Sequence, residues 1–361
     1  IRYFIMKKLT LKFGGTSVGT IEQIRKVANI VKKRHDDGNQ IIVIVSAMAG
    51  ATNKLMSNSK SISKNFDSKE LDVLISSGEQ VSSSLLSGAL IDLGIKARSW
   101  QGWQIPILTD DNYNSSKILN IKTDEILKFI SDRGVAVISG FQGISEKSRI
   151  TTLGRGGSDL SAVAIAKFFE TDACEIYTDV EGILTTDPNI DKNAKKIDKI
   201  SYEEMLEMAS LGAKVMQPHS IQDARLNRID IDVKSSFVNK RGTLITKKSN
   251  ILRNKIITGI SSTNNDSKIT LVGVKDKPGI AASIFKPLSE NSINVDMVVQ
   301  NISADGKETD LTFTIKSDDL QKTVKLVKKN SKIKFRNLII DKNVSKISII
   351  GVGTITTPGV T

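Results

Sequence analysis

The stretch Thr152-Leu153-Gly154-Arg155-Gly156-Gly157-Ser158-Asp159 is rich in glycine and carries both signs of charge. An apolar run at residues 134–141 precedes it, and a helical pattern at residues 160–167 follows it. This order predicts a strand, a glycine-rich turn and the N-terminus of a helix. Backbone N–H groups at such a terminus bind anions, Arg155 offers a planar fork to a carboxylate or phosphate, and Asp159 suits the positive end of the helix dipole. An ordinary turn with a surface ion pair is the alternative, and this stretch alone leaves both readings open.

Two more small-residue loops follow strand-like runs nearer the N-terminus. The alternating run at residues 9–13 leads into Gly14-Gly15, and the apolar run at residues 41–45 leads into a loop that begins at Ser46. Lys12 stands just before the two glycines, so its ammonium can reach phosphoryl oxygens that backbone N–H groups cradle. This is not a Walker A loop, in which the lysine follows the glycines. A tight turn explains Lys-x-Gly-Gly on its own equally well.

Strand-like and helix-like runs alternate over about the first 180 residues. This alternation predicts a mostly parallel sheet that is covered by helices on both faces. Ligands of such sheets bind beyond the carboxyl ends of the strands, which is where the small-residue loops lie. We therefore expect these loops on one edge of the sheet.

Other segments of this region carry further candidate binding residues. Glu79 lies in a helical stretch, residues 71–94, and its neighbours are uncharged and largely apolar, which favours a ligand role over that of a surface glutamate. The turn-rich segment Thr178–Pro188 suits a nucleotide base and ribose, although taken alone it is better explained as a surface hairpin. The segment Ser201–Leu211 predicts a helix that opens with a capping box and continues through Gly212–Met216.

The pattern changes after a polar stretch between about residues 246 and 253. Strand-like and helix-like runs then follow in the order βαββαβ, which predicts a ferredoxin-like unit. Residues 268–274 recur as residues 346–352, so the sequence holds an internal repeat. The second copy stops at Thr361, where its first helix should begin, and we expect either a fragment or an incomplete second module.

The composition is that of an ordinary globular chain of two or three domains, with 361 residues, of which 39% are hydrophobic. The net charge of +13 invites a nucleic-acid partner, but the lysines are scattered over polar helix faces and only 5% of the residues are aromatic. We expect no nucleic-acid partner, and no membrane partner, since no apolar run approaches the ~20 residues of a membrane helix.

The one cysteine, Cys174, is expected to be a buried small hydrophobe. There is no signal-peptide pattern at the N-terminus, where Met6 can be the start, so we expect a cytoplasmic protein.

Taken together and in order, these segments resemble the aspartate kinases of the amino-acid kinase family over nearly the whole chain. The matching motifs are Lys12–Val18, Ser46–Met48, Gly154–Asp159, Thr178–Pro188 and Gly212–Val215. The C-terminal repeat resembles tandem ACT modules, with their Asp-Lys-Pro-Gly and Asn-x-Asp-Met elements at residues 276–279 and 294–297. The resemblance is to the lysine- and threonine-sensitive type that carries two ACT modules.

The resemblance implies an α/β chain with an amino-acid-kinase catalytic domain, residues 6–246, built on a mostly parallel central sheet, and a C-terminal ACT regulatory region, residues 254–361. The first ACT module, of the ferredoxin-like type, would span residues 268–341, and a truncated second one would begin at residue 345. The implied activity is ATP-dependent phosphorylation of the L-aspartate β-carboxylate to 4-phospho-L-aspartate, the first step toward lysine, threonine and methionine. MgATP is the implied co-substrate, lysine and/or threonine are the implied effectors, and the implied assembly is a homo-oligomer or a complex with a regulatory subunit.

Residue roles follow from the same resemblance. Lys12 and Asp159 are the expected catalytic residues, with Lys12 neutralising the transferring phosphoryl group and Asp159 orienting Lys12. Arg155 would bind the α-carboxylate and Glu79 the ammonium of aspartate, and the full set of implied aspartate-binding residues is Ser46, Thr52, Glu79, Arg155, Gly156 and Ser158. The residues implied to bind ATP are Lys12, Phe13, Gly14, Gly15, Thr178, Asp179, Leu184, Lys214 and Val215. The residues implied to bind an effector are Asp276, Gly279, Ile280, Ala281, Asn294, Val295, Asp296 and Gln300, and no metal site formed by protein side chains is implied.

Two other functions stay open at this stage. One is a kinase for another amino acid, such as glutamate or acetylglutamate, which the ACT repeat and the full Gly-Arg-Gly-Gly-Ser-Asp motif disfavour. The other is a catalytically silent amino-acid-binding regulatory subunit, which the intact Lys12, Arg155 and Asp159 disfavour. With its second module truncated, we expect the chain to be an active or partly active kinase with weakened feedback inhibition.

Overall fold

The computed structural model describes residues 6–213, 215–248, 251, 256–275, 277–302, 308–330 and 333–351. The chain divides into two compact units. The first unit is built from residues up to 259 and from residue 349 onward, and the second from residues 260–348.

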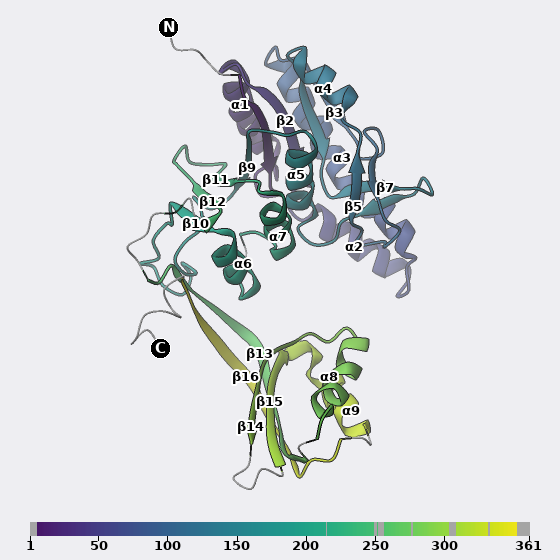
Figure 1. Ribbon diagram of the computed structural model, residues 1–361. Coiled ribbons are helices and arrows are strands. Elements are labelled where there is room, and N and C mark those ends of the chain that lie inside the picture. The colour runs from purple at the N-terminus through teal and green to yellow at the C-terminus, as the bar shows by residue number, and fades with distance from the viewer. Residues whose placement is uncertain are drawn as a thin grey trace. The chain divides into compact units, whose positions relative to one another are not determined.

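A twisted sheet forms the centre of the first unit (Figure 1). Within the described residues it has eight strands in the order β10-β12-β11-β9-β1-β2-β6-β3. All neighbouring strands are parallel except β11 and β12, so the predicted mostly parallel sheet is confirmed. The strand bounds are β1 (Lys8–Phe13), β2 (Gln40–Val45), β3 (Ala97–Trp100), β6 (Val135–Ser139), β9 (Ala173–Thr178), β10 (Lys199–Ser201), β11 (Ile231–Ser235) and β12 (Thr243–Thr246).

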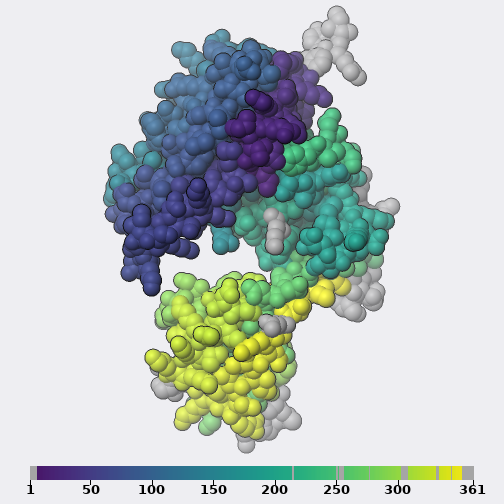
Figure 2. All heavy atoms as spheres, turned by 180° about the vertical axis from the view of Figure 1, so that it is seen from behind, coloured from purple at the N-terminus to yellow at the C-terminus, as the bar shows by residue number. Residues whose placement is uncertain are grey.

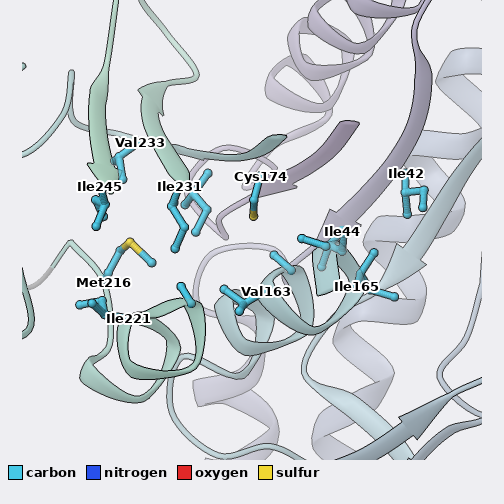
Figure 3. Packing of buried hydrophobic residues seen from close by; sticks show 14 of the residues in the cluster. Ile42, Ile44, Val163, Ile165, Cys174, Met216, Ile221, Ile231, Val233 and Ile245 are labelled. Atoms are coloured by element: carbon cyan, nitrogen blue, oxygen red, sulfur yellow. The ribbon is translucent and has the colours of Figure 1, made fainter. Parts of the chain in front are cut away.

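Helices cover both faces of this sheet because most residues of the central strands are apolar and nearly all are buried. One face packs against α1 (Ile21–Asp36) and α3 (Ser68–Asp92). The other face packs against α4 (Asp124–Ser131), α5 (Gly157–Phe168), α6 (Tyr202–Ser210) and α7 (Pro218–Asn227). Figure 3 shows this second core, in which Cys174 lies among branched aliphatic side chains; it is fully buried, as predicted.

The strand order places distant parts of the sequence side by side. Strand β1 lies between β2 and β9, and β9 in turn pairs with β11. On the surface of this unit the N-terminal residues, in purple, accordingly lie against the teal and green residues that follow β9 (Figure 2). Loops from both halves of the unit therefore meet at the end of β1.

A small second sheet carries the loop that contains Arg155. Within the described residues it has four strands in the order β5-β4-β7-β8, with the bounds β4 (Ile107–Thr109), β5 (Ile118–Ile121), β7 (Gln142–Ser145) and β8 (Ile150–Thr152). The prediction that the strand at residues 135–138 leads directly to the glycine-rich turn was wrong, because the antiparallel pair β7 and β8 intervenes. These two strands are only three or four residues long, which gives too little periodicity to recognise in sequence.

Helix α6 confirms one part of its prediction and corrects another. Ser201 and Glu204 form the predicted capping box. The helix ends at Ser210 and does not continue through residues 212–216, because Gly212 takes a φ of 116°, which no helical residue adopts. The chain then turns and enters α7 at Pro218.

The second unit has the predicted βαββαβ order. Its elements are β13 (Gly259–Lys275), α8 (Ile280–Glu290), β14 (Val295–Ile302), β15 (Glu308–Lys316), α9 (Leu320–Lys329) and β16 (Asn337–Ile350). Within the described residues the strands form a four-stranded sheet in the order β14-β15-β13-β16, and α8 and α9 lie on one of its faces (Figure 1). The repeat that begins at Lys346 continues β16 without a break as far as Ile350, and residues 352–361 lie outside the described residues.

The division between the units falls later than the polar stretch at residues 246–253. Residues 256–259 stay with the first unit, since the backbone N–H of Thr258 donates to the carbonyl of Ile350 at 2.8 Å. The chain thus leaves the first unit at residue 259 and returns to it at residue 349. The proposed catalytic range 6–246 therefore lies within the first unit, whereas the proposed regulatory range 254–361 includes segments of both.

Close backbone packing around Ala47 brings α3 against the ends of β1 and β2. A Cβ atom on Gly15 would lie 2.8 Å from the carbonyl oxygen of Ala47, and one on Gly78 would lie 2.7 Å from the Cβ of Ala47. Neither position has room for a side chain. Both glycines therefore permit the short distance between the loop after β1, the loop after β2 and α3.

We predict that Gly78→Ala destabilises the protein by about 1–3 kcal/mol, because the new methyl group meets Ala47 inside a packed interior. Gly88→Ala is the matched control in the same helix, where a Cβ meets no atom within 4 Å. It should stabilise the protein by about 0.5–1 kcal/mol through lower backbone entropy of the unfolded chain. Urea denaturation of the full chain measures both, and equal effects of the two substitutions would contradict the packing argument.

Candidate active site

The carboxyl ends of three neighbouring strands form one edge of the large sheet. Phe13 is in register with Val45 on one side and with Tyr177 on the other, so the loops after β1, β2 and β9 leave the sheet together. Two hydrogen bonds join these loops: the N–H of Gly14 donates to the carbonyl of Tyr177, and the N–H of Ser46 donates to the carbonyl of Phe13, each at 3.1 Å. The predicted meeting of the small-residue loops at one edge is confirmed.

A buried ion pair lies at this edge. The Nζ of Lys12, in β1, is 2.6 Å from Oδ1 of Asp159, in the first turn of α5. The side chains are only 10% and 9% exposed, so water screens their attraction little. The pair holds the lysine ammonium beside the glycine loop, and a Cβ on Gly14 would lie 3.6 Å from it.

A cavity of about 520 Å³ opens above the ion pair. Its walls include all eight residues predicted to act in catalysis or to bind aspartate: Lys12, Ser46, Thr52, Glu79, Arg155, Gly156, Ser158 and Asp159. They come from β1, the loop after β2, the helix α2 (Ala51–Ile62), α3 and the turn into α5. The structure thus brings together residues up to about 150 positions apart in sequence.

Glu79 is an unusual wall residue because it is a carboxylate with only 3% exposure. Its Oε1 accepts the backbone N–H of Ala47 at 3.0 Å, while Oε2 is buried with no hydrogen-bond partner among the described residues. Burial raises the pKa of Glu79 to about 7, and the bond from Ala47 opposes that rise. A cation that entered the cavity beside Oε2 would supply the missing partner.

Arg155 differs from Glu79 in charge and in exposure. Its side chain is exposed at the cavity wall, and we find no ion pair that engages it within the described parts of the chain. The cavity therefore presents a free guanidinium together with a buried carboxylate.

The residues predicted to bind ATP lie in two places, at the carboxyl ends of β1 and β9 and in segments further along the chain. Phe13 stacks on Tyr177 at a ring distance of 4.7 Å, which places the loop at Gly14-Gly15 beside Thr178 and Asp179. Thr178 donates its hydroxyl to Asp179 Oδ1 at 3.1 Å. Leu184 forms a β-bridge with Lys196, and Val215 packs partly buried against the core between α6 and α7. Lys214 lies outside the described residues.

Sequence reasoning missed several residues of this region. Asn53, Met56, Leu71, Ile75, Asn114, Phe141 and Thr152 also line the cavity. Met56 lies one helical turn after Thr52, so helical spacing would have found it once α2 was recognised. Asn114 belongs to no motif and gives no local signal. Ser236, which follows β11, donates its hydroxyl to Ser17 at 2.5 Å and so joins a fourth loop to the glycine loop.

The predicted effector residues lie in the second unit. Gly279 is the N-cap of α8 with a φ of 85°, and Ile280 and Ala281 open that helix. Asn294 precedes β14, and Val295, Asp296 and Gln300 belong to it; Asp296 forms an ion pair with Lys346. Strand β14 is an edge of the described four-stranded sheet. Asp276 lies outside the described residues.

Comparison with known proteins defines the class. Residues 7–235 match the amino acid kinase family, and residues 269–330 match an ACT domain. The chain belongs to the amino acid kinase family. Among the described helices, none is both long and apolar enough to cross a membrane.

Comparison with individual relatives shows which members of the amino acid kinase family this chain resembles. An aspartate kinase of Stutzerimonas stutzeri is 45% identical over 350 residues, which are 96% of this chain and 85% of the relative. The crystal structure of aspartate kinase from Synechocystis is 36% identical with a TM-score of 0.61, and the match covers 98% of this chain but only 61% of that one. E. coli aspartokinase III in complex with lysine and aspartate is 26% identical with a TM-score of 0.76, covering 95% and 87% of the two chains. Within the family the chain thus belongs with the aspartate kinases, and the resemblance found in its motifs is confirmed.

The raised pKa of Glu79 predicts a pH dependence of stability. The unfolded carboxyl ionises near its ordinary pKa of 4.5, whereas the folded one keeps its proton until about pH 7. The protein therefore loses stability as pH rises from 4.5 to 7, by up to about 3 kcal/mol from this group. Glu79→Gln should abolish that loss, because the amide cannot ionise.

Urea denaturation at pH 5 and pH 8 measures this effect. The free energy of unfolding of Glu79→Gln relative to wild type should rise between the two pH values. The exposed Glu22, which pairs with Lys26 on α1, supplies the control substitution Glu22→Gln. An unchanged difference between wild type and Glu79→Gln would show that Glu79 ionises normally.

Proposed function

We propose that this chain transfers the γ-phosphoryl group of MgATP to the β-carboxylate of L-aspartate and forms 4-phospho-L-aspartate, the first step toward lysine, threonine and methionine. The observation that carries the proposal is one cavity that holds the Lys12–Asp159 pair, the free Arg155 and the buried Glu79. Phosphoryl transfer requires positioning and charge neutralisation more than covalent chemistry, and these groups can provide both.

The charges of the cavity support an α-amino acid as the acceptor. Arg155 would bind the α-carboxylate with two parallel hydrogen bonds, and Glu79 would accept from the α-ammonium through its unpartnered Oε2. Ser46, Thr52, Gly156 and Ser158 would complete the walls of the acceptor site. The acceptor's side-chain carboxylate would then extend toward Lys12.

The ion pair supports the phosphoryl-transfer step. Lys12 would neutralise charge on the equatorial oxygens of the transferring group, and Asp159 would hold its ammonium in place. The Gly14-Gly15 loop would cradle the phosphates with the backbone N–H of Gly15 as donor, since the N–H of Gly14 already donates to the carbonyl of Tyr177. Phe13, Thr178, Asp179, Leu184, Lys214 and Val215 would form the remainder of the nucleotide site.

The ACT match supports feedback control by lysine and/or threonine through the second unit. The E. coli relative described above was solved with lysine bound. In this chain the effector would contact Asp276, Gly279, Ile280, Ala281, Asn294, Val295, Asp296 and Gln300.

Strand β14 lies at the edge of its described sheet and exposes Met297, Val298 and Val299. An exposed edge of this kind suits assembly into a homo-oligomer or with a regulatory subunit in the cytoplasm.

We predict that the purified chain turns over ATP with L-aspartate and not with L-glutamate, because one extra methylene would misplace the acceptor carboxylate. Trapping of the acyl phosphate with hydroxylamine measures the reaction. Turnover with L-glutamate alone would favour a kinase for another amino acid, and binding of aspartate without turnover would favour a silent regulatory subunit.

Lys12→Ala should lower kcat by about a thousandfold or more, because the ammonium that Asp159 holds beside the phosphate-binding loop would be lost. Lys8→Ala is the control on the same strand, where the ammonium donates to the carbonyl of Phe169 and lies outside the cavity. Circular dichroism reports whether each variant is folded. Full activity of a folded Lys12→Ala would refute the role given to this lysine.

The KM for L-aspartate should rise as pH falls below about 7, because protonated Glu79 is neutral and no longer attracts the ammonium. The KM for ATP should change less over the same range. In Glu79→Gln the KM for aspartate should be high at every pH. A steep pH dependence that survives in this variant would assign the titration to another group.

A further inference from the structure

We propose that Asp72 is a positioning residue that fixes the distance between Arg155 and Glu79, and with it the affinity for the amino-acid substrate. The inference rests on the proposed function of the cavity. Asp72 lies on α3, two helical turns before Glu79, and its side chain is fully buried. It is absent from every motif that the sequence presented.

Asp72 is surrounded by hydrogen-bond donors from two other segments. Thr152 donates its backbone N–H to Oδ2 at 2.9 Å and its hydroxyl to Oδ1 at 2.6 Å. Asn114 donates its backbone N–H to both oxygens at 3.1 Å. We find no cation paired with Asp72 within the described ranges, so these donors alone stabilise its buried charge.

Both donor residues hold the turn that carries Arg155. Thr152 ends β8, and the chain turns at Gly154 directly before Arg155. Asn114 contacts the same turn from the other side, since a Cβ on Gly154 would lie 3.1 Å from its carbonyl oxygen. Asn114 itself has a φ of 65°, a conformation that its hydrogen bond to Asp72 helps to hold.

Helix α3 connects this anchor to the other end of the substrate. Asp72 and Glu79 are both buried on the helix, and seven residues place them on one face. Asp72 therefore fastens the turn with Arg155 to the same rigid element that carries Glu79. Because Arg155 and Glu79 would bind the α-carboxylate and the ammonium, a shift of either by about 1 Å would weaken substrate binding.

Asp72 reaches the nucleotide side of the cavity only indirectly, through the turn that precedes α5. The Lys12–Asp159 pair joins β1 to α5, and within the described residues Asp72 makes no hydrogen bond to either element. Loss of the anchor should therefore affect the KM for aspartate far more than the KM for ATP. A purely structural role would lower stability and would not separate the two constants.

The test compares Asp72→Asn, Thr152→Val and Thr152→Ser in the full chain. Asp72→Asn places an amide N–H against backbone donors and should raise the KM for L-aspartate about ten- to a hundredfold, with less than about a twofold change in the KM for ATP. Thr152→Val keeps the backbone donor and loses the hydroxyl, so it should act in the same direction but less strongly. Thr152→Ser retains the hydroxyl and should restore the wild-type KM.

Thr109→Val is the matched structural control. Thr109 shares a buried hydroxyl–hydroxyl bond of 2.6 Å with Thr151, the neighbour of Thr152, and neither hydroxyl reaches Asp72. This variant should lose stability as Thr152→Val does and leave the KM for aspartate unchanged. If Thr109→Val and Thr152→Val change the KM for aspartate alike, or if Asp72→Asn raises both KM values equally, the proposal is wrong.

Calorimetric titration with L-aspartate separates this inference from the proposed function. Wild-type chain that binds aspartate without turning it over would contradict the proposed function, and the Kd values of the same variants would then decide the role of Asp72. Should Asp72→Asn fail to fold, the Thr152→Val and Thr152→Ser pair decides it. Equal affinity of those two variants for aspartate would overturn the proposal.

Discussion

The parallel pairing of β1 between β2 and β9 is the constraint on which the rest of the first unit depends. Parallel neighbours in register end at the same edge, so three loops that are far apart in sequence leave the sheet within hydrogen-bond distance of one another. Most of the residues around Lys12 come from other segments that this arrangement brings close, and not from the motif that contains the lysine. Helices α3 and α5 then approach the edge from opposite faces and complete the cavity.

Buried charge is stabilised in three different ways around this cavity. Lys12 and Asp159 neutralise each other, and Asp72 is surrounded by backbone and hydroxyl donors. Glu79 has one donor and one unpartnered oxygen, and its raised pKa records the remaining cost. Lys12 and Asp159 attract each other across 2.6 Å, and both oxygens of Asp72 accept hydrogen bonds that oppose the rise in its pKa caused by burial. The third is incomplete, and this is the property expected of a group that awaits a ligand.

Sequence reasoning recovered the residues whose signals are local. Lys12, Arg155 and Asp159 stand in loops whose composition indicates an anion site, and Glu79 stands out because its neighbours are uncharged. The resemblance then assigned their roles, which remain proposals. Asp72 and Asn114 could not be predicted, because their importance arises only from contacts between segments that the small sheet brings together. The end of α6 was misplaced for a related reason: the left-handed turn at Gly212 depends on backbone conformation that composition does not reveal.

The hydrogen bond between Thr258 and Ile350 has a consequence for the architecture of the chain. The two points at which the chain leaves the first unit and returns to it are adjacent, so the two ends of residues 260–348 lie close together. Bringing these two ends together costs little loop entropy once residues 260–348 have folded with their own ends side by side. Residues 260–348 have a hydrophobic core of their own, so we expect substitutions inside that core to leave the cores of the first unit intact.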